Sequence, residues 1–331
     1  ATKKALTWTS DHPEVAEVNP TSGVITAKSK GQAVITATAT DGSGEYATCT
    51  LTVTDDPMAP VYNHNKQHFA DLLVDAPGVP VTFTRIYDAM NTESGPFGPG
   101  WYFSLCGSCA ASGSTEVVKV ADKTLHFSID GDQYVPLDTN NKFVKNADNT
   151  YTLYTLNGIM YRFNANGFME QVADRNGNTL DITLDAATNL PTKVTDSVGR
   201  TYDVNYNADH LITSITQNDA SQRQFRRFSF EYTNGLLSAS KNPLGKIIHQ
   251  YEYSDGLLRK VCDNWNQVIR AIQYQGRVVT AVTEQNKTTS YFYGMDGEGH
   301  SILTKKLENG RPQTEIRNAM NQIVVDYSGT R

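Results

Sequence analysis

Hydrophobic and polar residues alternate along most of this chain, and in its second half the alternation recurs at a near-constant interval. The residues that end the alternating segments are spaced by 21, 22, 26, 21, 21 and 19 positions. They are Phe163, Leu184, Tyr206, Tyr232, Tyr253, Tyr274 and Tyr293. Alternation with period two predicts β-strands that have one apolar face. Self-similarity at about 20 residues predicts a repeat architecture, in which each unit covers the apolar face of its neighbours.

Each repeat contains two turn signals, which divide it into two strands. The first signals are Asn166-Gly167, Asn234-Gly235, Asp255-Gly256 and Gln275-Gly276, and Asn-Gly or Asp-Gly pairs favour hairpin turns. The second signals are polar segments that begin at Asp174, Asp196, Asn242, Asp263 and Glu284. The pattern predicts one continuous antiparallel sheet from about Asn149 to Tyr327, with Tyr and Phe on one face. Strand twist is expected to curl this sheet into a spiral or shell.

The repeats resemble the YD repeat of the Rhs (rearrangement hotspot) family. The residues that carry the resemblance are the Y-x-Y-(D/N/S)-x-x-G-x-L pattern and the D-x-x-G-(N/R/K) turn after it, as in the copies that begin at Phe230 and Tyr251. The resemblance covers about residues 150–331. The family includes polymorphic bacterial toxins, wall-associated proteins, insecticidal toxin-complex shells and the animal teneurins. It implies that residues 151–331 form a YD-repeat β-sheet that is part of a shell.

Residues 61–150 differ from the repeats. An alternating strand that contains Val81, Phe83 and Tyr87 runs into a Gly/Pro-rich turn over 95–100, which Trp101 follows. The stretch from Phe69 to Leu105 resembles the domain that precedes the first YD repeats in Rhs and wall-associated proteins. A repeat array needs an atypical terminal unit to cover its open end. We therefore predict a capping domain over 61–150, with Trp101 buried against the first repeat strands.

Residues 1–54 form a separate module in which short strands and turns alternate, as in a small sandwich. The segments Trp8-Thr9-Ser10 and Gly23-Val24-Ile25-Thr26-Ala27 resemble the bacterial immunoglobulin-like group 2 domain, which the chain matches with a shortened first strand. The expected core consists of Trp8, Val15, Val18, Val24, Ile25, Val34, Ile35 and Leu51. Residues 55–60 are rich in Asp and Pro, which predicts an exposed linker. The whole chain is therefore predicted to be all-β.

Composition excludes several classes of protein. The chain has 331 residues, with 29 Lys and Arg against 35 Asp and Glu, so its net charge is −6. This balance argues against a nucleic-acid partner, which would favour a basic face. The sequence contains no apolar run of about 18 residues, so we expect no membrane span. The chain begins within an expected strand, which indicates a fragment or a mature product.

Four cysteines occur, which is too few for a disulfide framework in a chain of this length. Cys106 and Cys109 form a lone C-x-x-C. Unpaired residues in a strand and turn are favoured for them, and a local disulfide or a metal or redox site are the alternatives. Their redox state stays open at this stage.

Other candidates for chemistry are also better explained as structural residues. His64 and His68 are four apart without helix signals, so they do not predict a shared ligand face. Ser104 and Ser108 have no base at a recognisable spacing. The pairs Asp130/Asp132 and Asp296/Glu298 lie beside glycines in turn-like segments, where solvated turns are favoured over weak calcium loops. We expect no catalytic, cofactor-binding or metal-binding residues and no cofactor.

The sequence favours a non-catalytic role. The first hypothesis is the structural N-terminal part of an exported Rhs/YD-repeat protein, whose β-shell carries, encloses or displays a C-terminal, toxin-like cargo. That cargo would be the partner and would lie outside this chain, because no self-cleaving aspartate motif precedes Arg331. The alternative is a cell-surface adhesin that binds a glycan or a protein. Both hypotheses place the protein outside the cell, either secreted or on the bacterial surface.

Overall fold

The computed structural model describes residues 6–28, 31–53, 66–74, 79–121, 123–137, 139–219, 221, 223–297, 300–308, 310–317 and 323–327. The predicted linker over 55–60 lies outside the described residues, as do His64 and Glu298. The described residues form strands and turns only, which confirms the all-β prediction. None of them belongs to a helix that could cross a membrane.

The N-terminal module consists of a three-stranded antiparallel sheet and a two-stranded ribbon. The sheet has the order β1-β4-β5, and β2 pairs with β3 in the ribbon. The strands are β1 (Leu6–Ser10), β2 (Ala16–Val18), β3 (Ile25–Ala27), β4 (Gly31–Ala39) and β5 (Tyr46–Val53). Its small core contains Val15, Ala16, Val18, Ala33 and Ile35, with Trp8, Leu51 and Val53 packed against it.

Three residues of the predicted core of this module are not in it, namely Val24, Ile25 and Val34. Val34 is half-buried, because it alternates along β4 with the core residues Ala33 and Ile35. Val24 is 62% exposed and Ile25 is 42% exposed, so the prediction was wrong for both. Ile25 opens β3, which pairs only with β2 among the described strands. An apolar residue in a short two-stranded ribbon can follow the alternating pattern of a strand and still be exposed to solvent.

The segment before the repeats forms two small sheets and a short ribbon. One sheet has the order β10-β7-β6, another has the order β11-β12-β13-β14, and β8 pairs with β9. The strands are β6 (Gln67–Val74), β7 (Val81–Tyr87), β8 (Ser94–Gly95), β9 (Gly98–Pro99), β10 (Trp101–Phe103), β11 (Gly107–Ser112), β12 (Thr115–Val120), β13 (Lys123–Asp130) and β14 (Gln133–Pro136). We call residues 66–137 the cap.

In the part of the chain that is described, 18 strands form one antiparallel sheet in which every strand pairs with its neighbours in sequence. This confirms the predicted continuous sheet, although it begins earlier than expected, at Lys142. Its strands are β15 (Lys142–Lys145), β16 (Tyr151–Tyr154), β17 (Met160–Phe163), β18 (Met169–Ala173), β19 (Thr179–Leu184), β20 (Pro191–Asp196), β21 (Thr201–Tyr206), β22 (Ile212–Asn218), β23 (Gln224–Thr233), β24 (Leu236–Lys241), β25 (Ile247–Ser254), β26 (Leu257–Cys262), β27 (Val268–Gln275), β28 (Val278–Glu284), β29 (Lys287–Met295), β30 (Ser301–Leu307), β31 (Gln313–Arg317) and β32 (Ile323–Tyr327).

The polar turn of the repeat has a local physical cause. In Asp174, one carboxylate oxygen accepts the backbone N–H groups of Asn176 (2.8 Å) and Asn178 (2.9 Å). Gly177, the third residue after the aspartate, has a φ of +82°, a conformation that glycine adopts without strain. The same pair of side-chain to backbone bonds recurs at Asn164, Asp196, Asn207, Asp219, Asn242 and Asp263. The short side-chain acceptor therefore fixes the chain reversal in these seven turns.

Four of the tyrosines that end the alternating segments tie their hairpin to the one before it. The hydroxyl of Tyr206 donates to the carbonyl of Pro191 (2.8 Å), and that of Tyr232 donates to the carbonyl of Ile212 (2.7 Å). Tyr274 and Tyr293 make the same kind of bond, to Leu258 (2.8 Å) and Val279 (2.6 Å). A large ring thus packs in the sheet while its polar end is satisfied, and the tyrosine spacing follows the hairpin period.

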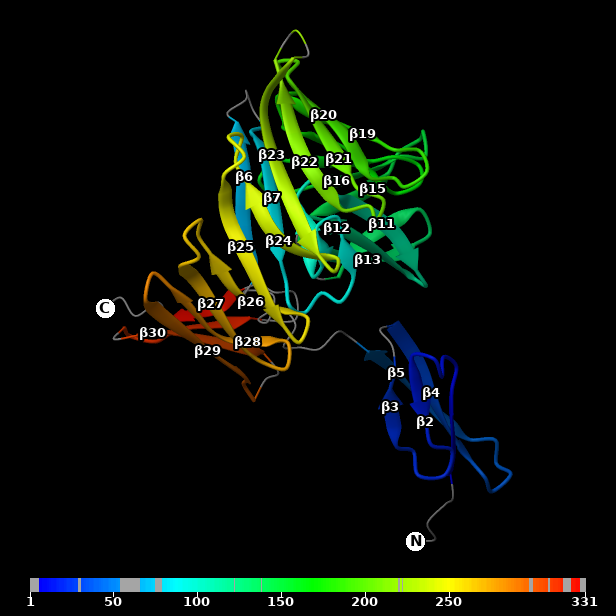
Figure 1. The fold of residues 1–331 in the computed structure, drawn as a ribbon. Helices are drawn as coiled ribbons and strands as arrows, with labels where there is room; N and C mark the ends of the chain where they lie inside the picture. Colours follow the sequence, from blue (N-terminus) through cyan, green and yellow to red (C-terminus); the bar gives the residue numbers. More distant parts are fainter. Residues whose placement is uncertain are drawn as a thin grey trace.

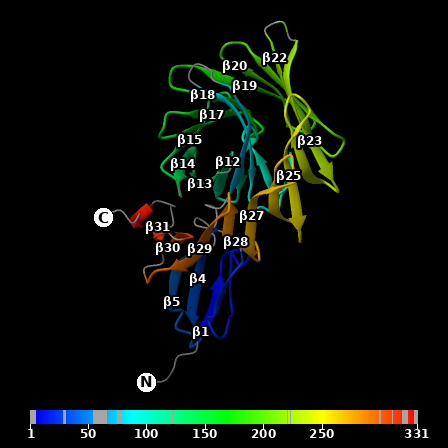
Figure 2. The same ribbon diagram turned by 60° about the vertical axis from the view of Figure 1, so that its left-hand side comes forward.

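The long sheet curls around the cap (Figure 1). Strands β22–β25 lie beside β6 and β7, and the turned view shows β12 and β13 between the two arms of the sheet (Figure 2). A single hydrophobic core joins the two parts, running from Phe69 in the cap to Val282 in β28. The cap therefore packs on the concave side of the sheet and shares its core.

Candidate functional site

Hydrogen bonds and aromatic contacts connect the cap to strand β25. Three side chains alternate on one face of this strand, namely His249, Tyr251 and Tyr253. Period two in a strand places residues i, i+2 and i+4 on the same side. On that side the cap contributes β6 and β7, and we call this contact the β25 interface.

Arg85 on β7 lies at the centre of the β25 interface with a relative exposure of 0%. Its Nε and Nη2 donate to the two carboxylate oxygens of Asp71 on β6, at 2.6 and 2.7 Å. Its Nη1 donates to the hydroxyl of Tyr251 at 2.8 Å. Two parallel bonds to one carboxylate are the strong, directional form of an arginine ion pair. The guanidinium therefore joins two cap strands to the repeat sheet.

Five aromatic rings surround the same guanidinium. Its central carbon lies 5.1 Å from the ring centre of Phe230 and between 5.4 and 5.6 Å from the other four. Those four rings belong to Phe69, Phe97, Trp101 and Tyr251. Cations are attracted to the faces of aromatic rings, and more strongly where water is excluded. The cage is filled by the protein's own arginine, so it acts as an internal clamp.

Trp101 makes a second connection across the interface. The ring is 1% exposed, which confirms the predicted burial. Its ring partners are Phe69, Tyr87 and Tyr251, so the predicted contact with the first repeat strands was wrong, because the sheet curls back and presents β25 to the cap (Figure 1). The Nε1–H of Trp101 donates to the hydroxyl of Tyr253 at 3.1 Å. Close by, the backbone N–H of Leu258 donates to the hydroxyl of Tyr87 at 3.0 Å, and Arg277 donates to the carbonyl of Ala89 at 2.7 Å. These bonds satisfy polar groups from both sides of the interface.

The Gly/Pro turn of the cap fits closely against the sheet. Gly98 has a φ of +96°, and a Cβ at this position would come within 2.7 Å of the carbonyl oxygen of Gly235. Gly235 belongs to the hairpin turn between β23 and β24. Glycine is therefore required at position 98 both for its backbone conformation and for the close approach.

Electrostatics keep the clamp charged. Burial alone would lower the pKa of Arg85, but the carboxylate of Asp71 and the hydroxyl of Tyr251 outweigh it and raise that pKa further above the physiological range. Burial raises the pKa of Tyr251, so the phenol stays protonated. The guanidinium is fully buried, and three of its N–H groups bond within the protein. Its chemical capacity is to hold two parts of the fold together.

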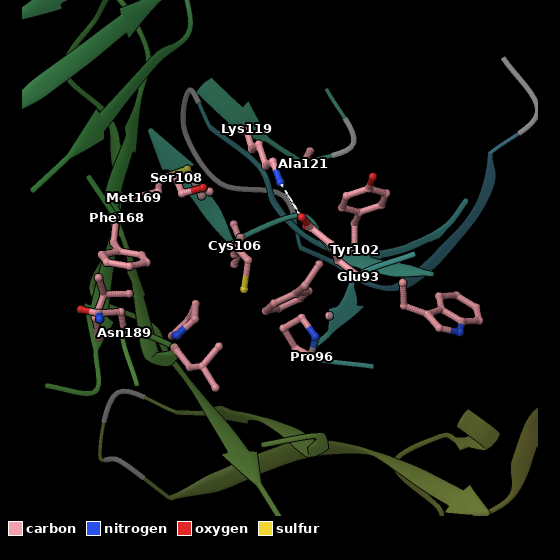
Figure 3. A pocket seen from close by; sticks show the side chains of 18 of the residues that line it. Glu93, Pro96, Tyr102, Cys106, Ser108, Lys119, Ala121, Phe168, Met169 and Asn189 are labelled. Atoms are coloured by element: carbon pink, nitrogen blue, oxygen red, sulfur yellow. Dashed lines mark hydrogen bonds and ion pairs between the residues drawn. The ribbon is translucent and has the colours of Figure 1, made fainter. Parts of the chain in front are cut away.

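A cavity of about 220 Å³ lies at the seam between the cap and strands β18–β20. Its lining is mainly apolar, with Pro96, Phe168 and Met169 around it, and the sulfur of Cys106 faces the space (Figure 3). Lys119 and Glu93 form an ion pair at its edge, with Nζ and Oε2 3.0 Å apart. The cavity offers packing surface for a small apolar group.

The C-x-x-C cysteines carry no reactive thiolate. Cys106 and Cys109 are both free in the structure. Burial raises the pKa of each thiol to about 12. Reactive cysteines have a lowered pKa, which stabilises the thiolate. The structure therefore corresponds to the favoured prediction, in which these are unpaired residues in a strand and turn.

The other candidates from the sequence are scattered through the fold. Asp130 and Asp132 lie in the exposed hairpin turn between β13 and β14. Asp296 accepts the backbone N–H of His300 at 2.8 Å, as in the other polar turns. Ser104 donates to the carbonyl of Thr82 and accepts the N–H of Thr84. His68 lies on β6. Among the described residues, no three His, Cys, Asp or Glu side chains are grouped as metal ligands.

Sequence reasoning missed Arg85 as the centre of the site. The available signal was the alternation in β7, where Val81, Phe83, Arg85 and Tyr87 occupy one face. An arginine on an otherwise apolar face predicts a buried cation that needs a carboxylate partner. Its partner Asp71 lies 14 positions earlier, and its contact with Tyr251 spans 166 positions. No local pattern connects residues that far apart.

Comparison with known proteins identifies one part of the chain. Residues 1–51 match the bacterial Ig-like domain (group 2), which confirms the resemblance of this module. Domains of this kind typically occur in extracellular or surface proteins. No curated protein matches the chain.

Two solved structures are similar to the chain at low identity. A crystal structure of TcdB2-TccC3-TEV is 12% identical with a TM-score of 0.27, and the match covers 92% of this chain and 16% of that one. A porin-like protein from Bacteroides uniformis is 14% identical with a TM-score of 0.22, over 64% of this chain and 91% of that one. The chain thus spans only a small part of the first of these proteins.

Proposed function

We propose that this chain is a non-catalytic scaffold, the capped beginning of a β-shell of the Rhs/YD-repeat type. In this proposal the shell carries, encloses or displays a C-terminal, toxin-like cargo of the same polypeptide. The single observation that carries it is the β25 interface. In this interface the buried Arg85 holds the cap onto the concave face of the long sheet. A shell that is closed at one end requires such a cap.

The YD-repeat assignment is supported by the regular roles of the repeated residues. Seven polar turns begin with an Asp or Asn that accepts two backbone N–H groups, and four tyrosines at strand ends bond the preceding hairpin. These residues are the ones that define the Y-x-Y and D-x-x-G pattern. The repeats supply core and surface residues of the sheet. These structural roles explain most of the sequence pattern over 142–327 without a catalytic role.

A location outside the cell, either secreted or on the bacterial surface, is part of the same proposal. It is supported by the bacterial Ig-like match over residues 1–51. Such a module serves as a spacer or a binding arm, so this match also supports the second candidate, a surface adhesin for glycans or proteins. The two candidates differ in the role of the concave face. A shell would enclose polypeptide there, whereas an adhesin needs no enclosed polypeptide.

Protease protection of the complete gene product tests the proposal. Polypeptide that follows residue 331 should resist a non-specific protease in the wild type and become sensitive in the Arg85→Ala variant, whose cap is loosened. Arg223→Ala is the matched control, because this arginine is 80% exposed in a surface ion pair. Equal digestion of the following polypeptide in wild type and both variants would contradict enclosure. Saturable binding of residues 1–331 to cells or glycans would then favour the adhesin.

A further inference from the structure

His249 is an unexplained member of the β25 interface. Its ring centre lies 5.7 Å from that of Phe69 on β6 and 6.2 Å from that of Tyr251. The Nδ1 atom is buried, and it has no hydrogen-bond partner in the part of the chain that the structure describes. Buried polar atoms are nearly always paired, because leaving one unsatisfied costs free energy. The stability of the β25 interface should therefore depend on whether the His249 ring is protonated.

The charges that face His249 come from several elements. Asp71 on β6 and Arg85 on β7 form the buried pair of the cap. On the repeat sheet, Arg270 of β27 packs over Phe69 at 5.2 Å and pairs with Glu284 of β28. Two cations and two carboxylates balance while the imidazole is neutral. A proton on His249 would add a positive charge beside two guanidinium groups whose carboxylates are already engaged.

The protonation equilibrium of His249 follows from this environment. Burial lowers the pKa of His249 below the ordinary 6.5, and Arg85 and Arg270 lower it further, while Asp71 opposes them. The unfolded chain therefore takes up this proton at a higher pH than the folded chain does. The contribution of His249 to the free energy of unfolding is fully present above pH 6.5. It is lost as the pH falls from 6.5 towards the lowered pKa of His249 in the folded state.

We propose that His249 makes the docking of cap strands β6 and β7 onto β25 sensitive to acid. Near neutral pH the neutral imidazole packs against Phe69 and Tyr251, and the cap stays clamped. On acidification, the protonated ring repels Arg85 and Arg270, and the β25 interface opens before the rest of the sheet unfolds. The chemistry is that of a histidine switch, in which a charge appears at a packed interface. This inference concerns the interface itself and holds whether or not the concave face encloses a cargo.

Neighbouring repeats indicate how to remove the switch. Phe228 and Arg270 stand 21 positions before and after His249, at the equivalent place of the adjacent repeats. Phe228 is 8% exposed, so a phenylalanine is accommodated at this repeat position. His249→Phe keeps a flat ring and removes the titratable group. His249→Gln, which keeps a neutral polar side chain, serves as a second variant if the first does not fold.

Hydrogen exchange of the complete chain between pH 7.5 and pH 5 tests the proposal, with rates corrected for intrinsic exchange. In the wild type, amides of β6 and β7 should exchange faster at pH 5, by about tenfold for each unit by which the pKa of His249 is lowered. Amides of β19–β21 should change less. In His249→Phe, or in His249→Gln, the acceleration in β6 and β7 should disappear.

A control and a direct titration complete the test. His12→Gln alters an exposed histidine of the N-terminal module, and it should leave the acid response of β6 and β7 unchanged. The imidazole proton resonances of His249 should titrate below pH 6.5. Equal acceleration in wild type and both His249 variants, or a His249 that titrates at or above pH 6.5, would overturn the proposal.

Discussion

The indole N–H of Trp101 donates to the hydroxyl of Tyr253 at 3.1 Å, and this bond joins positions that are 152 residues apart. In the repeats on either side, the equivalent tyrosines donate to a carbonyl of the preceding hairpin. Tyr253 is thus a repeat residue whose hydroxyl serves the cap. The bond between Trp101 and Tyr253 therefore identifies β25 and β26 as the hairpin to which the cap is attached.

Removal of the Trp101 side chain should destabilise the whole capped sheet. Trp101→Ala deletes a ring that is 1% exposed and packs against Phe69, Tyr87 and Tyr251, so the expected loss in free energy of unfolding is about 3–5 kcal/mol. Urea denaturation measures it. Trp265→Ala is the control, because that ring is 76% exposed, and it should change stability by less than about 0.5 kcal/mol. Similar midpoints for the two variants would show that Trp101 is not part of the core.

The Arg85–Asp71 pair should behave as a buried ion pair. Either Arg85→Met or Asp71→Leu leaves one charge without its partner, and each should cost about 3–5 kcal/mol of unfolding free energy. The double variant should be more stable than either single variant, since methionine and leucine can fill the ring-lined space without a buried charge. Strictly additive losses in this double-mutant cycle would show that the two residues do not act as a pair.

The tyrosine hydroxyls should each contribute a modest amount. Tyr274→Phe removes the donor to the carbonyl of Leu258 and keeps the ring, so the expected cost is about 0.5–1.5 kcal/mol. Thermal or urea unfolding measures the difference. Tyr46→Phe is the control, because Tyr46 is 70% exposed on the N-terminal module. A Tyr274→Phe variant as stable as the control would mean that the bond contributes no net stability.

The polar turns should make the sheet sensitive to acid below about pH 4. Bonds from the side chain and backbone of Asn178 lower the pKa of Asp174, and backbone bonds from Thr188 and Arg223 lower those of Asp185 and Asp219. When folding lowers the pKa of a carboxyl group, the group stabilises the fold above its pKa in the unfolded chain. This stabilisation is lost as the pH falls through its pKa in the folded chain. The melting temperature should therefore drop between pH 5 and pH 3. Asp174→Asn keeps an acceptor without the charge and should reduce this drop, while an unaltered profile would contradict the assignment.

Metal removal should leave the protein unchanged. Of the candidate carboxylates, Asp296 accepts the backbone N–H of His300, and Asp130 and Asp132 lie in an exposed turn. We expect the melting temperature to be the same with and without a strong chelator, and no turnover of generic ester, glycoside or peptide substrates. A drop of several degrees on chelation would favour a calcium loop at one of these turns.

The sequence predicted the fold where the physics is local. Alternation predicted the strands, and Asn-Gly and Asp-Gly predicted the hairpins at Asn234 and Asp255, where φ is positive at both turn positions. The same pattern failed at Val24 and Ile25, because alternation does not say whether a partner layer covers a strand. The clamp at Arg85 could not be predicted, because its contacts depend on how the sheet curls back onto the cap.

An experimental density map of the complete gene product would show whether the capped sheet forms a wall around polypeptide. The cap should lie in place on β25, and the sheet should curl around further polypeptide of the same chain. A sheet whose remaining concave face is open to solvent, with all following polypeptide outside it, would contradict enclosure.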